Sequence, residues 1–275
     1  MNEHVTAPKT LDHHGCRLSY RVRGEGPSVL FIQGVGVHGD GWNPQVDGLR
    51  RRFRCLTFDN RGMGLSQPVG RPLSIPQMAA DALAIMDAEG WPAAHVVGHS
   101  LGGLIAQHLA LVARERVLSL ALLCTICRGK DAAIPSPRMM WLGLRSNVGT
   151  LRMRRHAFLQ IVMPPEALLR ADRDALAEQL APLFGHDLAV QPPIAMKQLS
   201  AMARYDATPR LGELAGLRTL VVSAAHDPIA RPEFGRRLAE SIPGARFLLI
   251  PDASHGVPIQ QAERVNELLA AHFDG

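Results

Sequence analysis

The stretch HVVGHSLGGLIAQHLA, residues 95–110, joins a run of apolar strand-forming residues directly to a helical pattern. Ser100 stands at the joint, between Gly98 and Gly102. Flanking glycines allow a sharp turn and leave the hydroxyl open, while the new helix directs its unpaired N–H groups toward the same point. This arrangement is the nucleophile elbow G-x-S-x-G, which predicts Ser100 as a catalytic nucleophile. The alternative is a serine that only caps the helix between loop glycines.

Strand and helix patterns alternate along the rest of the chain. Several strand patterns are continuously apolar, which favours parallel strands covered on both faces. This alternation predicts an α/β fold with a mostly parallel central sheet flanked by helices. The expected strands are Arg17–Arg23, Ser28–Gln33, Arg54–Asp59, His95–Gly98, Val117–Cys124, Arg218–Ala224 and Arg246–Ile250, and the expected helices cover 75–90, 101–115, 232–241 and 257–273.

The alternation breaks once, between residues 128 and 206. This segment shows no clear strand pattern, contains recurrent prolines and has mainly helical apolar patterns. We interpret residues 128–206 as a helical cap inserted into a core made of residues 1–127 and 207–275.

Two further residues complete a candidate triad with Ser100. A serine attacks only when a base removes its proton, and the base needs an orienting carboxylate. Behind a nucleophile elbow the acid comes first and the histidine second. Asp227 in VVSAAHDPIARP and His255 in FLLIPDASHGVPI each follow an apolar strand pattern, so they should share a sheet edge with Ser100. Asp131 and Asp252 are the alternative acids.

Acyl transfer also requires donors for the oxyanion that forms on the substrate. The backbone N–H of Leu101, directly after the nucleophile, is one candidate. The second is the N–H of Val35 in the glycine-rich segment FIQGVGVHGDGW, where Gly34 permits a tight turn. The alternative is that this loop needs its glycines only for flexibility.

Together these motifs resemble the α/β-hydrolase superfamily over nearly the whole chain. GHSLGG resembles its elbow, FDNRGMGLS its D-x-R-G-x-G-x-S loop, and residues 223–255 its acid-to-histidine segment. Where the family often has His-Gly, this chain has Gln33-Gly34, and QGVGVHGDGWNPQ is similar to the corresponding loop of 3-oxoadipate enol-lactonases and related esterases. The resemblance implies the α/β-hydrolase fold, carboxylesterase or lactonase chemistry, and structural roles for Asp59 and Arg61.

The candidate substrate contacts are residues beside the nucleophile and on the expected cap. They are Gln33, Gly34, His99, Met140 and Trp141. His99 also suits a packing role beside the elbow, and Met140 and Trp141 also suit the interior of the cap.

Between positions 128 and 155 there are seven basic residues and one acidic residue. The net positive charge of this segment alone exceeds the net charge of +5 of the whole chain. They would either guide an anionic substrate, rest on an anionic surface, or form a solvated helix face.

Composition narrows the functional classes. The pI is about 9.4, but aromatic residues make up only 5% and no basic tail is present, which argues against nucleic-acid binding. We expect no integral membrane segment, no secretory signal and a cytoplasmic location. Four cysteines do not make a disulfide framework, and Cys124-Thr-Ile-Cys127 lacks further zinc ligands. We therefore expect no metal and no cofactor.

The sequence thus predicts a serine hydrolase that cleaves a small carboxylic ester or lactone through an acyl-enzyme on Ser100. An anionic substrate is one of the alternatives that the basic residues between positions 128 and 155 leave open. Two alternatives stay open. One is a C–C bond hydrolase or perhydrolase with the same triad. The other is a slow-turnover binding or receptor protein that keeps the fold. The sequence does not indicate the oligomeric state.

Overall fold

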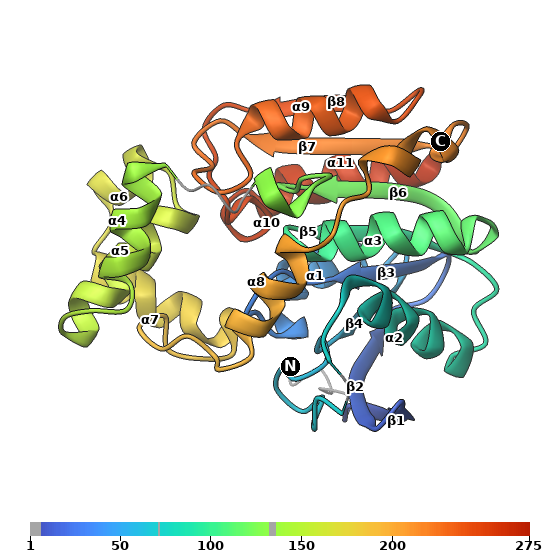
Figure 1. Cartoon of the computed structure of the whole chain (residues 1–275), viewed down its shortest axis with the longest axis horizontal. Helices are drawn as coiled ribbons and strands as arrows, with labels where there is room; N and C mark the ends of the chain where they lie inside the picture. Colours follow the sequence, from blue (N-terminus) through green and yellow to red (C-terminus); the bar gives the residue numbers. More distant parts are fainter. Residues whose placement is uncertain (1–6, 71, 132–135) are drawn as a thin grey trace.

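The computed structural model describes residues 7–70, 72–131 and 136–275. Eight strands form one sheet in the order β1-β2-β4-β3-β5-β6-β7-β8 (Figure 1). Their bounds are β1 Lys9–His13, β2 Cys16–Arg23, β3 Ser28–Ile32, β4 Arg54–Phe58, β5 Ala94–His99, β6 Val117–Leu123, β7 Thr219–Ala224 and β8 Arg246–Ile250.

The sheet is parallel from β4 through β3, β5, β6 and β7 to β8, and antiparallel where β2 joins β4 and β1 joins β2. The predicted fold class and all seven predicted strands are confirmed, with ends that differ by one residue at most. Strand β1 was not predicted. It is a largely exposed edge strand of sequence KTLDH, and its five residues carry no continuous apolar signal.

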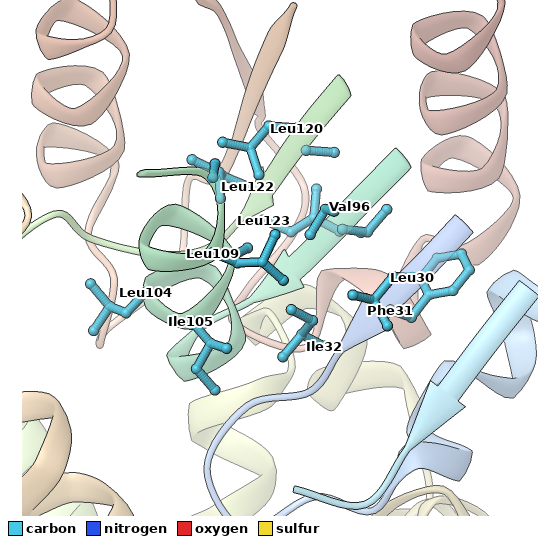
Figure 2. Close-up of a cluster of buried hydrophobic side chains, with 14 of the residues drawn as sticks. Leu30, Phe31, Ile32, Val96, Leu104, Ile105, Leu109, Leu120, Leu122 and Leu123 are labelled. Atoms are coloured by element: carbon cyan, nitrogen blue, oxygen red, sulfur yellow. The ribbon is translucent and has the colours of Figure 1, made fainter. Parts of the chain in front are cut away.

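Helices cover both faces of this sheet. In Figures 1 and 2, α3 lies on one side of the strands and α11 on the other. Among the described residues, no helix is both long and apolar enough to span a membrane. The helices are α1 Asn43–Leu49, α2 Ile75–Ala88, α3 Leu101–Val112, α4 Pro137–Arg145, α5 Leu151–Val162, α6 Pro165–Arg170, α7 Arg173–Phe184, α8 Ala195–Ala203, α9 Pro232–Ser241, α10 Val257–Gln260 and α11 Ala262–Asp274.

The main core lies between these helices and the central strands. Figure 2 shows β3, β5 and β6 presenting apolar side chains such as Leu30, Val96 and Leu122 to their neighbours. Leu104 and Leu109 of α3 belong to the same fully buried cluster. The burial of β3 explains its continuous apolar run, whereas the buried strands β5 and β6 also contain His95, His99 and Ser119.

Helices α4 to α8 all lie between β6 and β7 in the chain, where the cap was expected. Helices α4 to α7 gather at one end of the sheet, at the left of Figure 1. They have their own buried cluster, which includes Leu142, Leu159, Leu180 and Phe184. Residues 132–135 of the expected cap lie outside the described residues, and the domain boundaries stay a prediction.

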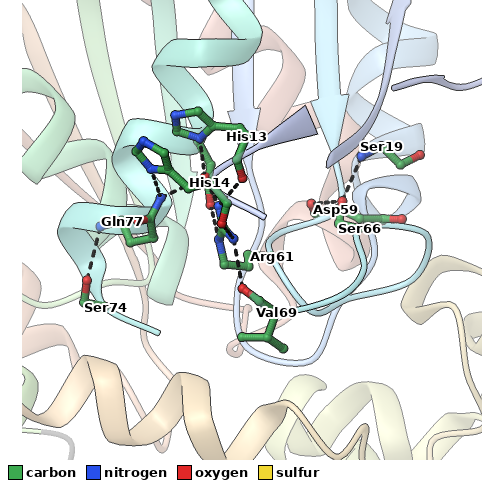
Figure 3. Close-up of polar contacts among 10 residues, drawn as sticks. His13, His14, Ser19, Asp59, Arg61, Ser66, Val69, Ser74 and Gln77 are labelled. Atoms are coloured by element: carbon green, nitrogen blue, oxygen red, sulfur yellow. Dashed lines mark hydrogen bonds and ion pairs between the residues drawn. The ribbon is translucent and has the colours of Figure 1, made fainter. Parts of the chain in front are cut away.

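The segment after β4 is held by buried polar contacts (Figure 3). The Arg61 side chain is fully buried and donates to both carboxylate oxygens of Asp81, at 2.9 and 2.6 Å, and to the Val69 carbonyl. Asp59 accepts the N–H groups of Gly39 and Leu65. Both residues bind other parts of the protein, as the structural roles implied by the resemblance require.

Candidate active site

Ser100 is the single residue that separates β5 from α3, and it has the unusual backbone angles φ 54° and ψ −118°. The flanking glycines are required by close packing. A Cβ at Gly98 would lie 2.3 Å from the carbonyl oxygen of Gly102, and one at Gly102 would lie 2.0 Å from that of Ile32. The strand and helix can therefore meet only where side chains are absent.

The strained residue is held by its own backbone contacts. Ser100 N donates to the Leu123 carbonyl at 3.0 Å, and its carbonyl accepts from Gly103 N at 2.9 Å and Thr125 Oγ1 at 2.6 Å. Such unfavourable φ/ψ values persist only when the surroundings over-determine them, and they cluster at active sites.

The structure brings Asp227 and His255 together. Asp227 follows β7, His255 follows β8, and His255 Nδ1 lies 2.7 Å from Asp227 Oδ2. Burial would raise the pKa of the Asp227 carboxyl, but attraction to His255 and hydrogen bonds from His255, Ile229 N and Ala230 N lower it overall. The ionised carboxylate accepts the proton on Nδ1, which leaves Nε2 as the basic nitrogen of His255.

Neither alternative acid contacts His255. Asp131 pairs with Arg128, at 2.6 Å, and with Arg237. Asp252 lies at the surface and accepts hydrogen bonds from Gln261 and Arg264.

His99 directly precedes Ser100 and contacts the loop of His255. Its Nε2 donates to the His255 carbonyl at 2.8 Å, and the two rings lie 4.9 Å apart. Burial lowers the pKa of His99 to about 3, so this imidazole is neutral. Within the described chain, no hydrogen bond links Ser100 Oγ to His255 Nε2. Such catalytic contacts are often long without substrate.

The two candidate oxyanion donors are unpartnered. Among the described residues, neither Leu101 N, at the start of α3, nor Val35 N makes a hydrogen bond. The loop of Val35 lies against the elbow, since a Cβ at Gly34 would be 3.1 Å from Ser100 Cβ. Unpaired N–H groups near a nucleophile are what an oxyanion requires, and their role stays a prediction.

The remaining candidate substrate contacts differ in burial. Gln33 is only 4% exposed, and its Oε1 accepts the N–H of Gly34. Met140 and Trp141 are 62% and 59% exposed, so neither belongs to the cap interior. The Arg145 guanidinium lies over the Trp141 ring. Contact of any of them with a substrate stays a prediction.

Three of the basic residues at the start of the cap have acidic partners. Arg128 pairs with Asp131, Arg152 with Asp174 and Arg155 with Asp187. These pairs reduce the positive charge that the expected cap segment presents.

A cleft of about 550 Å³ opens between the loop after β4 and the segment before α8. Gly62, Val69, His186 and Lys197 are among its lining residues, and no member of the candidate triad lines it.

The cysteines have no partners among themselves. All four are buried free thiols, and burial, together with the negative charge of Asp227, raises the pKa of Cys124. In the described ranges, no group of three or more His, Cys, Asp or Glu side chains could hold a metal ion.

Several residues at this site carried no signal in the sequence. Gln198 and His186 contact the backbone of Gly36, Ser254 contacts the backbone of His226 beside Asp227, and Thr125 contacts the backbone of Ser100. They match no motif, because their partners are backbone groups distant in sequence. Of the four, only Ser254 is adjacent in sequence to a predicted site residue, His255.

Comparison with known proteins shows the family to which the chain belongs. A family model described as alpha/beta hydrolase fold matches residues 27–262. The protein named "Putative carbamate hydrolase RutD" of Azorhizobium caulinodans is 29% identical over 255 residues, covering 92% of this chain and 93% of that protein. "Putative non-heme bromoperoxidase BpoC" of Mycobacterium tuberculosis is 31% identical over 271 residues, covering 93% and 97%. The solved enol-lactonase from Burkholderia xenovorans has a TM-score of 0.81 at 27% identity, covering 97% of this chain and 100% of that one. The chain belongs to the alpha/beta hydrolase fold family.

Proposed function

We propose that the protein is a serine hydrolase that cleaves a carboxylic ester or lactone through an acyl-enzyme on Ser100. The observation that carries the proposal is the 2.7 Å hydrogen bond between His255 Nδ1 and buried Asp227, on the loops beside the strained elbow. The similarity of the whole chain to an enol-lactonase structure supports ester or lactone chemistry.

In this mechanism His255 Nε2 accepts the Ser100 hydroxyl proton as Oγ attacks the substrate carbonyl carbon. The electron pair of the carbonyl moves to its oxygen, which accepts hydrogen bonds from Val35 N and Leu101 N. Collapse of this adduct expels the alcohol with the proton from His255. A water molecule, activated by His255, then hydrolyses the acyl-enzyme.

The test is labelling with a fluorophosphonate probe, followed by hydrolysis of a panel of aryl esters, lactones and carbamates. Wild type should be labelled, Ser100→Ala should not, and at least one ester or lactone should turn over with loss of activity in Ser100→Ala. Equal labelling of the two proteins, or no labelling of either, would overturn the proposal.

Two different outcomes would favour the alternatives. Cleavage of a vinylogous diketone without ester turnover would indicate a C–C hydrolase. Peroxide-dependent oxidation would indicate a perhydrolase, for which the similarity to a protein named as a bromoperoxidase is the specific reason.

A further inference from the structure

Three consecutive backbone N–H groups follow β3, and only the middle one is unpaired. Gly34 N donates to Gln33 Oε1 at 2.9 Å, and Gly36 N donates to Gln198 Oε1 at 2.8 Å. Val35 N, between them, makes no hydrogen bond to any described residue. Two glutamine side chains therefore occupy the N–H groups on either side of the candidate oxyanion donor.

Both glutamines are well suited to fix the loop. Gln33 is 4% exposed and Gln198 is fully buried, so water does not compete for either contact. A backbone N–H can only donate, and the amide orientation in each pair is therefore set by chemistry, with the oxygen toward the loop.

Gly36 is held at both of its polar atoms from the cap. Gln198 on α8 accepts its N–H, and His186 Nε2 donates to its carbonyl oxygen at 2.8 Å. Gly36 has φ +69°, a conformation that L side chains rarely adopt. The cap segment and the oxyanion loop are thus joined at a residue next to Val35.

We propose that Gln33 and Gln198 are positioning residues of the oxyanion hole, which fix the peptides around Val35 and leave its N–H as the one available to the substrate oxyanion. Gln198 makes the cap part of the catalytic apparatus, while Gln33 acts from the residue where the family often has histidine. The inference rests on the proposed acyl-enzyme function.

The physical reason is that an N–H group stabilises the oxyanion only when it is already held in the correct position before the oxyanion forms. Loss of one donor in such a hole costs roughly 10²- to 10³-fold in kcat, and a displacement of about 1 Å costs on the order of 10²-fold. Neither glutamine touches the reacting atoms in this scheme. Their removal should therefore weaken binding of the tetrahedral adduct and leave binding of the ground-state ester nearly unchanged.

The variants are Gln198→Met and Gln33→Met, which keep side-chain length and remove the acceptor oxygen. Gln191→Met is the matched control. The Gln191 side chain lies near Gly36, between α7 and α8, but within the described residues its Oε1 accepts no hydrogen bond, whereas Gln198 Oε1 accepts the N–H of Gly36. For each protein, kcat and KM are measured on the ester that wild type cleaves best. The dissociation constant of a trifluoromethyl ketone that forms an oxyanion adduct is measured alongside, with Tm.

Both test variants should lose about ten- to a hundredfold in kcat, with KM within about twofold, and should bind the ketone more weakly by the same factor. Gln191→Met should keep wild-type kcat and ketone affinity. Unchanged kcat and ketone affinity in both test variants, or an equal loss in Gln191→Met, would overturn the inference. If Gln198→Met does not fold, the kcat and ketone affinity of Gln33→Met alone test the inference. Failure of wild type to form the ketone adduct would instead refute the acyl-enzyme function.

Discussion

Asp227 uses its two carboxylate oxygens for different partners. Oδ2 accepts from His255 Nδ1, while Oδ1 accepts the N–H groups of Ile229, at 2.8 Å, and Ala230, at 2.9 Å. The turn after β7 thereby holds the carboxylate that in turn holds the imidazole. The aspartate is both an orienting group for His255 and a structural element of its own loop.

Replacement of Asp227 by asparagine separates these two functions. The side-chain amide oxygen of an asparagine can still accept the backbone N–H groups, so Asp227→Asn should fold, but the amide no longer favours the His255 tautomer with a basic Nε2. We expect kcat to fall by about 10⁴-fold, measured on the best ester with circular dichroism as the folding check. Asp252→Asn, at the surface, is the control and should keep full activity. Retention of most activity in Asp227→Asn would show that another group orients His255.

At the scale of the element, β5 and α3 meet more closely than any side chain would allow. The third glycine of GHSLGG, Gly103, faces Thr125, whose Oγ1 would lie 2.4 Å from an added Cβ. The same threonine donates to the Ser100 carbonyl. The glycines of the elbow therefore serve packing as much as access of substrate to the serine.

Gly102→Ala tests this close contact. Its Cβ would meet the Ile32 backbone oxygen at 2.0 Å, and we expect the free energy of unfolding to fall by about 3 kcal/mol or more. Gly143→Ala is the matched control, because Gly143 lies within α4 and its added Cβ would have no neighbour within 4 Å. There alanine should stabilise by about 0.5–1 kcal/mol through helix propensity. Urea unfolding measures both, and a Gly102→Ala protein as stable as wild type would contradict the packing.

At the scale of the whole molecule, the loop of His255 is hydrogen-bonded to the end of α5 as well as continuous with the sheet. Gly256 N donates to the Val162 carbonyl at the end of α5, at 2.9 Å. Ser254 Oγ lies 3.0 Å from the Ile161 and His226 carbonyl oxygens. Together with the Gln198 contact to Gly36, these bonds join helices α5 and α8 to the loops after β8 and β3.

Three buried histidines give the molecule a dependence on pH that is separate from catalysis. Burial lowers the pKa of His95 to about 4, of His99 to about 3 and of His272 to about 4, from an ordinary value of 6.5. Between pH 6.5 and 4 the unfolded chain binds protons that the folded chain does not, so stability falls as pH falls. The pKa of Asp227 is lowered from its ordinary value of 3.8. Asp227 therefore lowers the free energy of unfolding only when the pH falls below about 3.8, where the carboxylate of the unfolded chain becomes protonated.

We therefore expect the free energy of unfolding to decrease by about 1.4 kcal/mol per pH unit for each of the three histidines below pH 6. Urea titrations at pH 7.5, 6.0 and 5.0 measure the slope. His272→Gln, which removes one such histidine outside the triad, should make the slope shallower. A free energy of unfolding that is the same at pH 6.0 and pH 5.0 would refute the assignment.

The sequence alone predicted seven of the eight strands and placed Ser100 at the joint between β5 and α3. Apolar runs predicted the central strands because a strand covered on both faces has no polar side. The elbow was recognisable because its residues, Gly98 to Gly102, are adjacent in the sequence. It also identified Asp227 and His255 by chain order, and the structure brings the two together.

Edge strand β1 escaped prediction because its short, exposed sequence lacks that signal. Only the tertiary structure showed that Gln33 and Gln198, 165 positions apart by their numbers, take the two N–H groups beside Val35. Contacts between a side chain and a distant backbone N–H leave no pattern in the sequence. An N–H is present at nearly every residue, and only folding decides which of them a side chain reaches.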